Sequence, residues 1–115
     1  MLKQPPYPVK ITVIKKTFHK DFVEKWATGH GSDWVKGSIG EGAGCCHAFD
    51  IGQEFVSDGV HMPEGFIDAA WVDIQKYVLI LARGGNMLGV QEGVFVTQCS
   101  DGFRPVSFKL ERIDD

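Results

Sequence analysis

Apolar and polar residues alternate near both ends of the chain, and this period of two predicts a half-buried strand at each place. The first strand is expected over 9–13, where Ile14 interrupts the pattern, and the last over 106–111. Their apolar positions are Val9, Ile11, Val13, Val106, Phe108 and Leu110. Pro105 stands at the start of the last strand, where a missing backbone donor does little harm.

The strongest periodic pattern predicts an amphipathic helix over 66–82, because its apolar residues recur at steps of three and four. These residues are Ile67, Ala70, Trp71, Ile74, Tyr77, Val78 and Leu81. Gly84-Gly85 is expected to end the helix. Asp68 near its N-terminus and Arg83 near its C-terminus carry the charges that interact favourably with the helix dipole. Each fully buried large side chain contributes about 1.5–3 kcal/mol, so this helix should anchor the core.

Weaker patterns supply the remaining elements. A short helix is expected over 20–27, a short strand over 51–56 and an apolar strand over 94–99. The strand over 51–56 stops at Asp58-Gly59, a pair that favours a tight hairpin turn. The glycine-rich stretch over about 28–48 reads as a long loop.

These elements together predict one α+β domain over 1–115. Its small mixed or antiparallel sheet packs against one main helix at about 66–82. A length of 115 residues, 43% apolar and 23% charged, suits a single globular domain. The net charge of −3 gives no electrostatic reason to expect nucleic acid as a partner.

Targeting and cysteine patterns favour a cytoplasmic protein. The first eight residues hold no apolar signal segment, and the longest apolar run, 78–82, is far shorter than the roughly 20 residues that span a bilayer. No membrane association is therefore expected. The cysteines number three, and Cys45 and Cys46 are adjacent, which suits a disulfide framework poorly. We expect reduced thiols.

Cys46, His47 and Cys99 form the first candidate site, with His19 and His61 as further candidates. Thiolate and imidazole suit a transition metal such as zinc, and a thiol can also act as a redox group or nucleophile. Cys46 and Cys99 are far apart in the sequence, so only the fold can bring them together. The alternative is that the cysteines are small buried hydrophobes.

Asp101 and Arg104 form a second candidate site, because a guanidinium beside a turn can bind an anionic ligand. In the alternative, Asp101 only stabilises the turn, and Arg104 forms an ion pair with an acidic residue on the surface. Trp34 is a further candidate for ligand binding, and Trp34 and Phe49 are candidates for a subunit or partner interface or for a lid over the sheet. Asp73 falls off the apolar helix stripe and is expected to be solvated.

Five segments resemble a family of small uncharacterised prokaryotic proteins. They are Lys10–Lys15, Gly52–Phe55, Pro63–Phe66 with Ala70–Asp73, Asp101–Pro105 and Phe108–Ile113. The family carries a cysteine before a Gly-Asp-Glu-Phe-like motif and ends in Phe-x-Ile/Leu-Glu-Arg-Ile. Cys46 and Cys99 match two of its cysteine positions, while Ile67-Asp68 stands where the family has Cys-Pro. The resemblance implies a fold and a set of thiols, but no particular activity.

Two functions follow as hypotheses. The first is a small cytoplasmic binding or accessory module that self-associates, as a homo-oligomer, or joins a larger enzyme. The second is a metal- or thiol-centred protein, possibly an enzyme, that uses Cys46 and Cys99. Neither rests on a recognisable catalytic triad or paired acids, because the sequence shows none.

Overall fold

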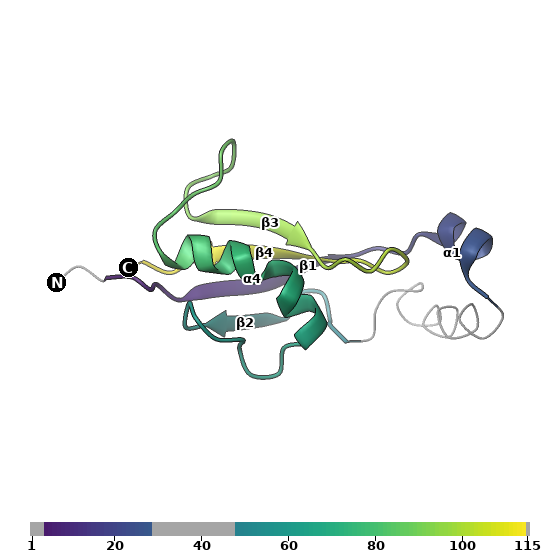
Figure 1. Ribbon diagram of the computed structural model, residues 1–115, viewed down its shortest axis with the longest axis horizontal. Helices are drawn as coiled ribbons and strands as arrows, with labels where there is room; N and C mark the ends of the chain where they lie inside the picture. The colour runs from purple at the N-terminus through teal and green to yellow at the C-terminus, as the bar shows by residue number, and fades with distance from the viewer. Residues whose placement is uncertain (1–3, 29–47, 115) are drawn as a thin grey trace.

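The chain folds as an antiparallel sheet with a helix packed on it (Figure 1). A computed structural model describes residues 4–28 and 48–114. In them the strands are β1 (Val9–Lys16), β2 (Glu54–Ser57), β3 (Val94–Gln98) and β4 (Val106–Arg112), and the helices are α1 (Lys20–Trp26) and α4 (Asp68–Ala82). The strand order is β2-β1-β4-β3, with every pair antiparallel. The predicted α+β class is confirmed.

The two strands with the clearest alternation, β1 and β4, lie at the centre of the sheet. Val9 pairs with Arg112 and Val13 with Phe108. The apolar residues of both strands face the same side and are fully buried, as the period of two predicts. Between Val13 and Lys15 the register shifts, and Ile14 at this bulge is 40% exposed. The break that Ile14 makes in the sequence pattern is therefore a bulge in the strand.

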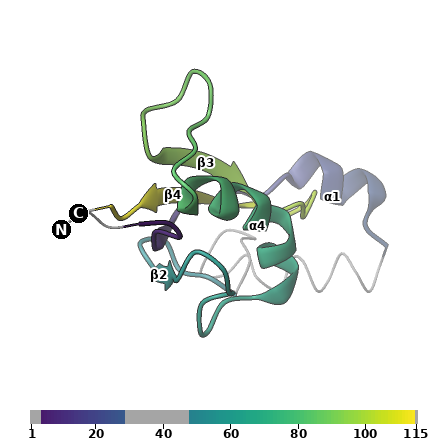
Figure 2. The ribbon, with the colours of Figure 1, turned by 60° about the vertical axis from the view of Figure 1, so that its left-hand side comes forward.

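Helix α4 lies across one face of the sheet and supplies the other half of the core (Figures 1 and 2). Most of the predicted stripe is buried, namely Ala70, Trp71, Ile74, Val78 and Leu81, together with Ala82. Tyr77 is partly buried, whereas Ile67, the residue before the first turn, is 39% exposed. The helix ends as predicted: Arg83 caps it and Gly84 follows with φ +91°.

The end of α4 is held by an arginine from the last strand. The Arg112 side chain is only 5% exposed. Its Nη1 donates to the carbonyl oxygens of Leu81 at 3.2 Å and Gly85 at 2.7 Å, and its Nη2 donates to Asn86 Oδ1 at 3.1 Å. A cation at this end of a helix also interacts favourably with the helix dipole. Arg112, which belongs to the C-terminal sequence motif, therefore connects the sheet to the helix.

A cluster of phenylalanines fills the core near the start of α4. Phe49 lies within 5.2 Å of both Phe66 and Phe108 and 5.9 Å from Phe55, measured between ring centroids. Phe49 is 3% exposed, and Lys16 Nζ donates to its carbonyl oxygen at 2.6 Å. The suggestion that Phe49 forms a partner surface is wrong, because the side chain packs into the core. The alternative, that it folds down over the sheet, describes its position.

The two central strands present a polar surface on the opposite face of the sheet. It presents Lys10, Lys109 and Glu111 from the two central strands. Lys10 Nζ lies 3.8 Å from Glu111 Oε1 and also 3.8 Å from Glu54 Oε2 on β2. Such half-exposed ion pairs contribute little stability each, but they keep this face compatible with water.

The segment around β2 differs from the sequence prediction in two ways. The strand begins at Glu54 and not at 51, because Gly52 adopts φ +91° and turns the chain. In the part of the chain that the structure describes, no strand after Asp58-Gly59 pairs with β2, so the predicted hairpin there is wrong. Instead Asp58 Oδ1 accepts hydrogen bonds from the N–H groups of Val60 and His61 at 2.8 and 2.7 Å, which opens a loop toward α4.

Gly59 in this loop has no room for a side chain. Its φ is +93°, and a Cβ built on it would lie 2.6 Å from the carbonyl oxygen of Tyr7 and 2.9 Å from the Cβ of Ala82. The residue therefore has to be glycine both for its backbone angle and for the close approach of three segments.

Helix α1 follows β1 and lies beyond the end of the sheet that is opposite to the start of β1 (Figure 1). The N–H groups of Thr17 and His19 donate to the carbonyl oxygens of Pro105 and Phe103, each at 2.9 Å, and so prolong the β1–β4 pairing toward it. Across residues 4–28 and 48–114, every helix is too short or too polar to cross a bilayer.

Candidate functional site

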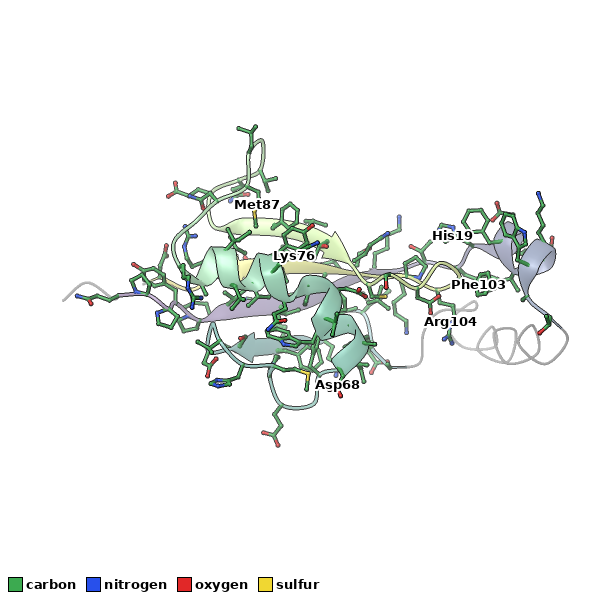
Figure 3. The ribbon with its side chains drawn as sticks, in the orientation of Figure 1. His19, Asp68, Lys76, Met87, Phe103 and Arg104 are labelled. Carbon is green, nitrogen blue, oxygen red and sulfur yellow. The ribbon has the colours of Figure 1, made fainter. Side chains whose placement is uncertain are left out.

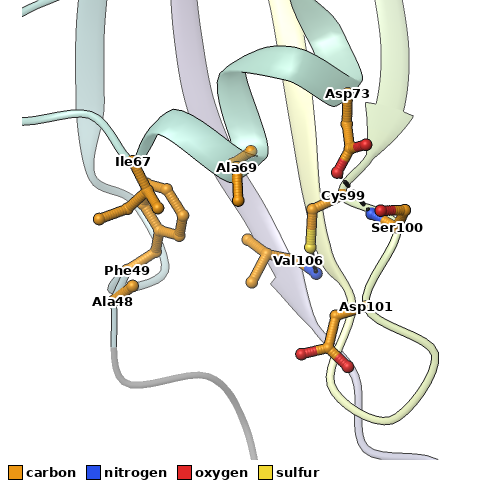
Figure 4. Close-up of a pocket in the computed structure, with 10 residues that line it drawn as sticks. Ala48, Phe49, Ile67, Ala69, Asp73, Cys99, Ser100, Asp101 and Val106 are labelled. Atoms are coloured by element: carbon orange, nitrogen blue, oxygen red, sulfur yellow. Dashed lines mark hydrogen bonds between the residues drawn. The ribbon is translucent and has the colours of Figure 1, made fainter.

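A pocket of about 360 Å³ opens where α4 begins and β3 ends (Figure 4). It is lined by Ala48, Phe49, Ile67, Ala69, Ala70, Asp73, Cys99, Ser100, Asp101 and Val106. Its size falls at the lower end of the range for small-molecule sites. Three separate parts of the chain build it: the segment before β2, the first turns of α4, and the turn between β3 and β4.

Cys99 is half-buried in the wall of this pocket, directly after β3. Its N–H donates to the carbonyl oxygen of Val106 at 3.0 Å, and its Sγ accepts a hydrogen bond from the N–H of Val106 at 3.3 Å. The backbone of β4 therefore fixes the direction of the thiol. Figure 4 shows the sulfur between the helix and the turn.

Asp73 joins the helix to the turn. Its Oδ2 accepts a hydrogen bond from the N–H of Ser100 at 2.7 Å, a short distance that is typical of a charged acceptor (Figure 4). Asp73 as a residue is only partly exposed. It leaves the apolar stripe as the sequence predicts, and the hydrogen bond to the turn after β3 is a contact that the sequence did not predict.

Asp101 organises the turn itself. Its Oδ1 accepts hydrogen bonds from the N–H groups of Phe103 and Arg104 at 2.8 and 2.9 Å. Its Oδ2 lies 3.5 Å from Nε of Arg104, whose side chain is 8% exposed. Figure 3 shows Phe103 and Arg104 on the part of the turn that extends toward α1. Asp101 lines the pocket and Arg104 does not, so the structure pairs these two residues with each other beside the pocket.

The remaining candidates divide into two groups. Trp34, Cys46 and His47 lie outside the described residues. His19 stands before α1, and His61 Nδ1 lies 2.8 Å from Asp58 Oδ2 beyond β2. Within residues 4–28 and 48–114, no three His, Cys, Asp or Glu side chains gather in a way that could hold a metal ion.

Sequence reasoning identified Cys99 and Asp101 but missed the pocket between them and α4. The sequence feature that could have revealed it is the small pair Ala69-Ala70, which precedes Asp73 by one helical turn and leaves space beside the core. Searches of protein-family models, of curated proteins and of solved structures each found no match to this chain.

Proposed function

We propose that this chain is a small binding module whose pocket takes a mainly apolar small molecule that carries a cationic or hydrogen-bond-donating group. One observation supports this most: among the residues that the structure describes, the pocket lining combines apolar walls with two carboxylates, Asp73 and Asp101, and includes no Lys, Arg or His. Carboxylates accept hydrogen bonds and attract cations. An anionic ligand, which Asp101 and Arg104 suggested in the sequence, would meet two negative charges in this pocket.

In this proposal the apolar walls supply affinity and the carboxylates supply orientation. Phe49, Ile67 and Val106 offer apolar contact area, as is usual for ligand pockets. Cys99 adds a polarisable sulfur whose direction is fixed by Val106. The module works in the cytoplasm, where this thiol stays reduced.

Nuclear magnetic resonance with matched fragments tests this function. Benzylamine and benzoate have the same ring and opposite charges. Benzylamine should shift the amide signals of Ala70, Ser100 and Asp101 and saturate at about millimolar concentration, as is usual for fragments, whereas benzoate should not. Equal shifts with both compounds, or none with either, would contradict the proposed ligand class.

Two substitutions on α4 provide the matched control. Ala69→Leu places a larger side chain in the pocket and should abolish the benzylamine shifts. Val72→Leu places the same leucine side chain on the same helix at a residue that is 72% exposed and does not line the pocket, so it should leave the shifts unchanged. If Ala69→Leu binds like the natural chain, the fragment does not occupy this pocket.

A second function, a thiol or metal centre that uses Cys46 and Cys99, is favoured by one specific observation. Ala48 and Cys99 line the same pocket, and covalent geometry keeps the Cα of Cys46 within about 7 Å of the Cα of Ala48. Cys46 and His47 therefore stand within two positions of a residue that shares the pocket with Cys99. A zinc ion bound by these three side chains would match the preference of zinc for sulfur and nitrogen ligands.

Elemental analysis of protein purified without chelator, followed by thiol titration, tests the second function. We expect near-stoichiometric zinc in the natural chain and in Cys45→Ser, and loss of the metal in Cys46→Ser and Cys99→Ser. Metal below about 0.2 equivalents together with unreactive thiols would contradict this function.

A further inference from the structure

The core is incompletely covered on the side of β3. The hydrophobic side chains that pack against the core but stay only partly buried are Tyr77, Met87, Phe95 and Cys99. All lie on β3 or beside it: the ring centroids of Tyr77 and Phe95 are 4.6 Å apart, and Met87 precedes the strand (Figure 3). On the β2 side, Phe55 and Phe66 are buried to 9% and 6% exposure. Among residues 4–28 and 48–114, the core is therefore covered less completely on the β3 side than on the β2 side.

The backbone of β3 is also open along its outer edge. The carbonyl of Gly93 accepts from Arg112 and the N–H of Cys99 donates to Val106, so the odd-numbered residues of the strand face β4. By the alternation of antiparallel strands, Val96 and Gln98 direct their N–H and C=O groups outward. No other described strand lies beyond β3.

Hydrogen bonds at both ends limit this open edge to two residues. The N–H of Val94 donates to Gln91 at 3.1 Å, and the N–H of Ser100 donates to Asp73. Val96 and Gln98 therefore retain both an outward donor and an outward acceptor. The strand Val94–Gln98 contains no charge and no proline, the features that usually protect an edge strand from pairing.

We propose that two copies of this chain associate by antiparallel pairing of β3 with β3, about a two-fold axis beside Thr97. In this register Val96 lies opposite Gln98 of the second copy. Each N–H then donates to a C=O across the axis, and every outward group of these two residues is used. The same edge serves both copies, as a two-fold interface requires.

The second copy is the occupant that this edge fits. Its β3 has the same length and the same donor and acceptor positions, and pairing would cover Phe95 and Tyr77 of both copies with apolar surface. Leu88, which is fully exposed in the loop before β3, lies on this side of the molecule as well. The other edge, β2, is shorter and carries Glu54, which pairs with Lys10, so charge protects it.

Sedimentation velocity at about 1 to 100 μM tests this interface, a range that covers weak and moderate dimers. The natural chain should show a monomer–dimer equilibrium. Gln98→Pro removes an N–H that faces outward and spares the ladder to β4, so it should weaken dimerisation by at least about tenfold. Val56→Pro makes the matched change on the outer edge of β2 and should leave the dimer intact.

A charge test shows whether the two β3 strands meet each other. Val96→Lys with Gln98→Lys keeps the backbone donors but places like charges across the axis, so the dimer should be lost. Mixing this variant with Val96→Glu and Gln98→Glu should restore a heterodimer. A natural chain that stays monomeric throughout, a dimer that survives both changes to β3, or a mixture that stays monomeric would overturn the proposal. Circular dichroism of each variant confirms that it is folded.

Discussion

Replacing Arg112 with alanine should destabilise the protein more than a change at any exposed charge. The side chain is 5% exposed and donates to three acceptors at the end of α4, at 2.7 to 3.2 Å. Hydrogen bonds to a charged group contribute about 1.5–3 kcal/mol each, and partial replacement by water reduces their sum. We expect Arg112→Ala to lower the free energy of unfolding by about 3–5 kcal/mol.

A thermal melt followed by circular dichroism measures this loss. For a chain of 115 residues the entropy of unfolding is about 0.24 kcal/mol/K, so the loss corresponds to a fall in Tm of about 12–20 °C. Arg112→Lys should recover part of it, because lysine keeps the charge at the helix end but lacks the fork that reaches several acceptors.

Lys109→Ala is the matched control on the same strand. Lys109 is 40% exposed and its ion pair to Glu111, at 3.3 Å, is open to solvent, so the Tm should change by less than about 4 °C. If Arg112→Ala is as mild as Lys109→Ala, the arginine does not hold the helix end and the reasoning is refuted.

Three further predictions concern single residues. Gly59→Ala should lower the free energy of unfolding, measured by urea titration, by about 2–4 kcal/mol, because the added methyl group overlaps the backbone. Gly52 has a similar φ but nothing within 4 Å of an added Cβ, so Gly52→Ala should lower it by about 1 kcal/mol. Equal losses in the two variants would contradict the close approach at Gly59. The pKa of Asp58 is lowered from 3.8 to about 2, first by the hydrogen bond to the His61 side chain and then by backbone N–H groups. The stability that this carboxylate contributes is present above pH 3.8 and is lost as the pH falls toward 2. The nuclear magnetic resonance signal of the Asp58 carboxyl carbon should therefore titrate with a midpoint near pH 2, and His61→Ala should raise that midpoint. A midpoint near 3.8 in the natural chain would refute this prediction. Asp73→Ala should cost about 1–3 kcal/mol and broaden the amide signals of the β3–β4 turn, and unchanged signals would show that the bond from helix to turn is not formed.

The sequence predicts the elements with strong periodicity and little of how they meet. The apolar periods of β1, β4 and α4 lie within the elements themselves, so their positions are confirmed to within a few residues. The strand order depends on pairings between distant segments, which no local pattern encodes. For the same reason the hairpin at Asp58-Gly59 was predicted wrongly: the pair forms a turn, but the next segment is not a strand.

The residues of the pocket could likewise be predicted from the sequence only in part. Cys99 and Asp101 stand out by residue type, and both line it. The hydrogen bond from Ser100 to Asp73 could not be predicted, because the helix period shows which residues leave the stripe but not which of them a neighbouring turn will contact. Arg112 belongs to the C-terminal motif, yet its role depends on the carbonyl groups of a helix that ends thirty positions earlier, as the bond to Leu81 shows.

The central pairing of the sheet joins the two strands that are most distant along the chain. Val9 lies opposite Arg112, so β1 has no central neighbour until β4 has been synthesised. Contacts of such long sequence separation slow folding, because a large loop must close before they form. A nascent chain on the ribosome therefore carries β1 and the apolar stripe of α4 without the centre of their sheet until β4 emerges.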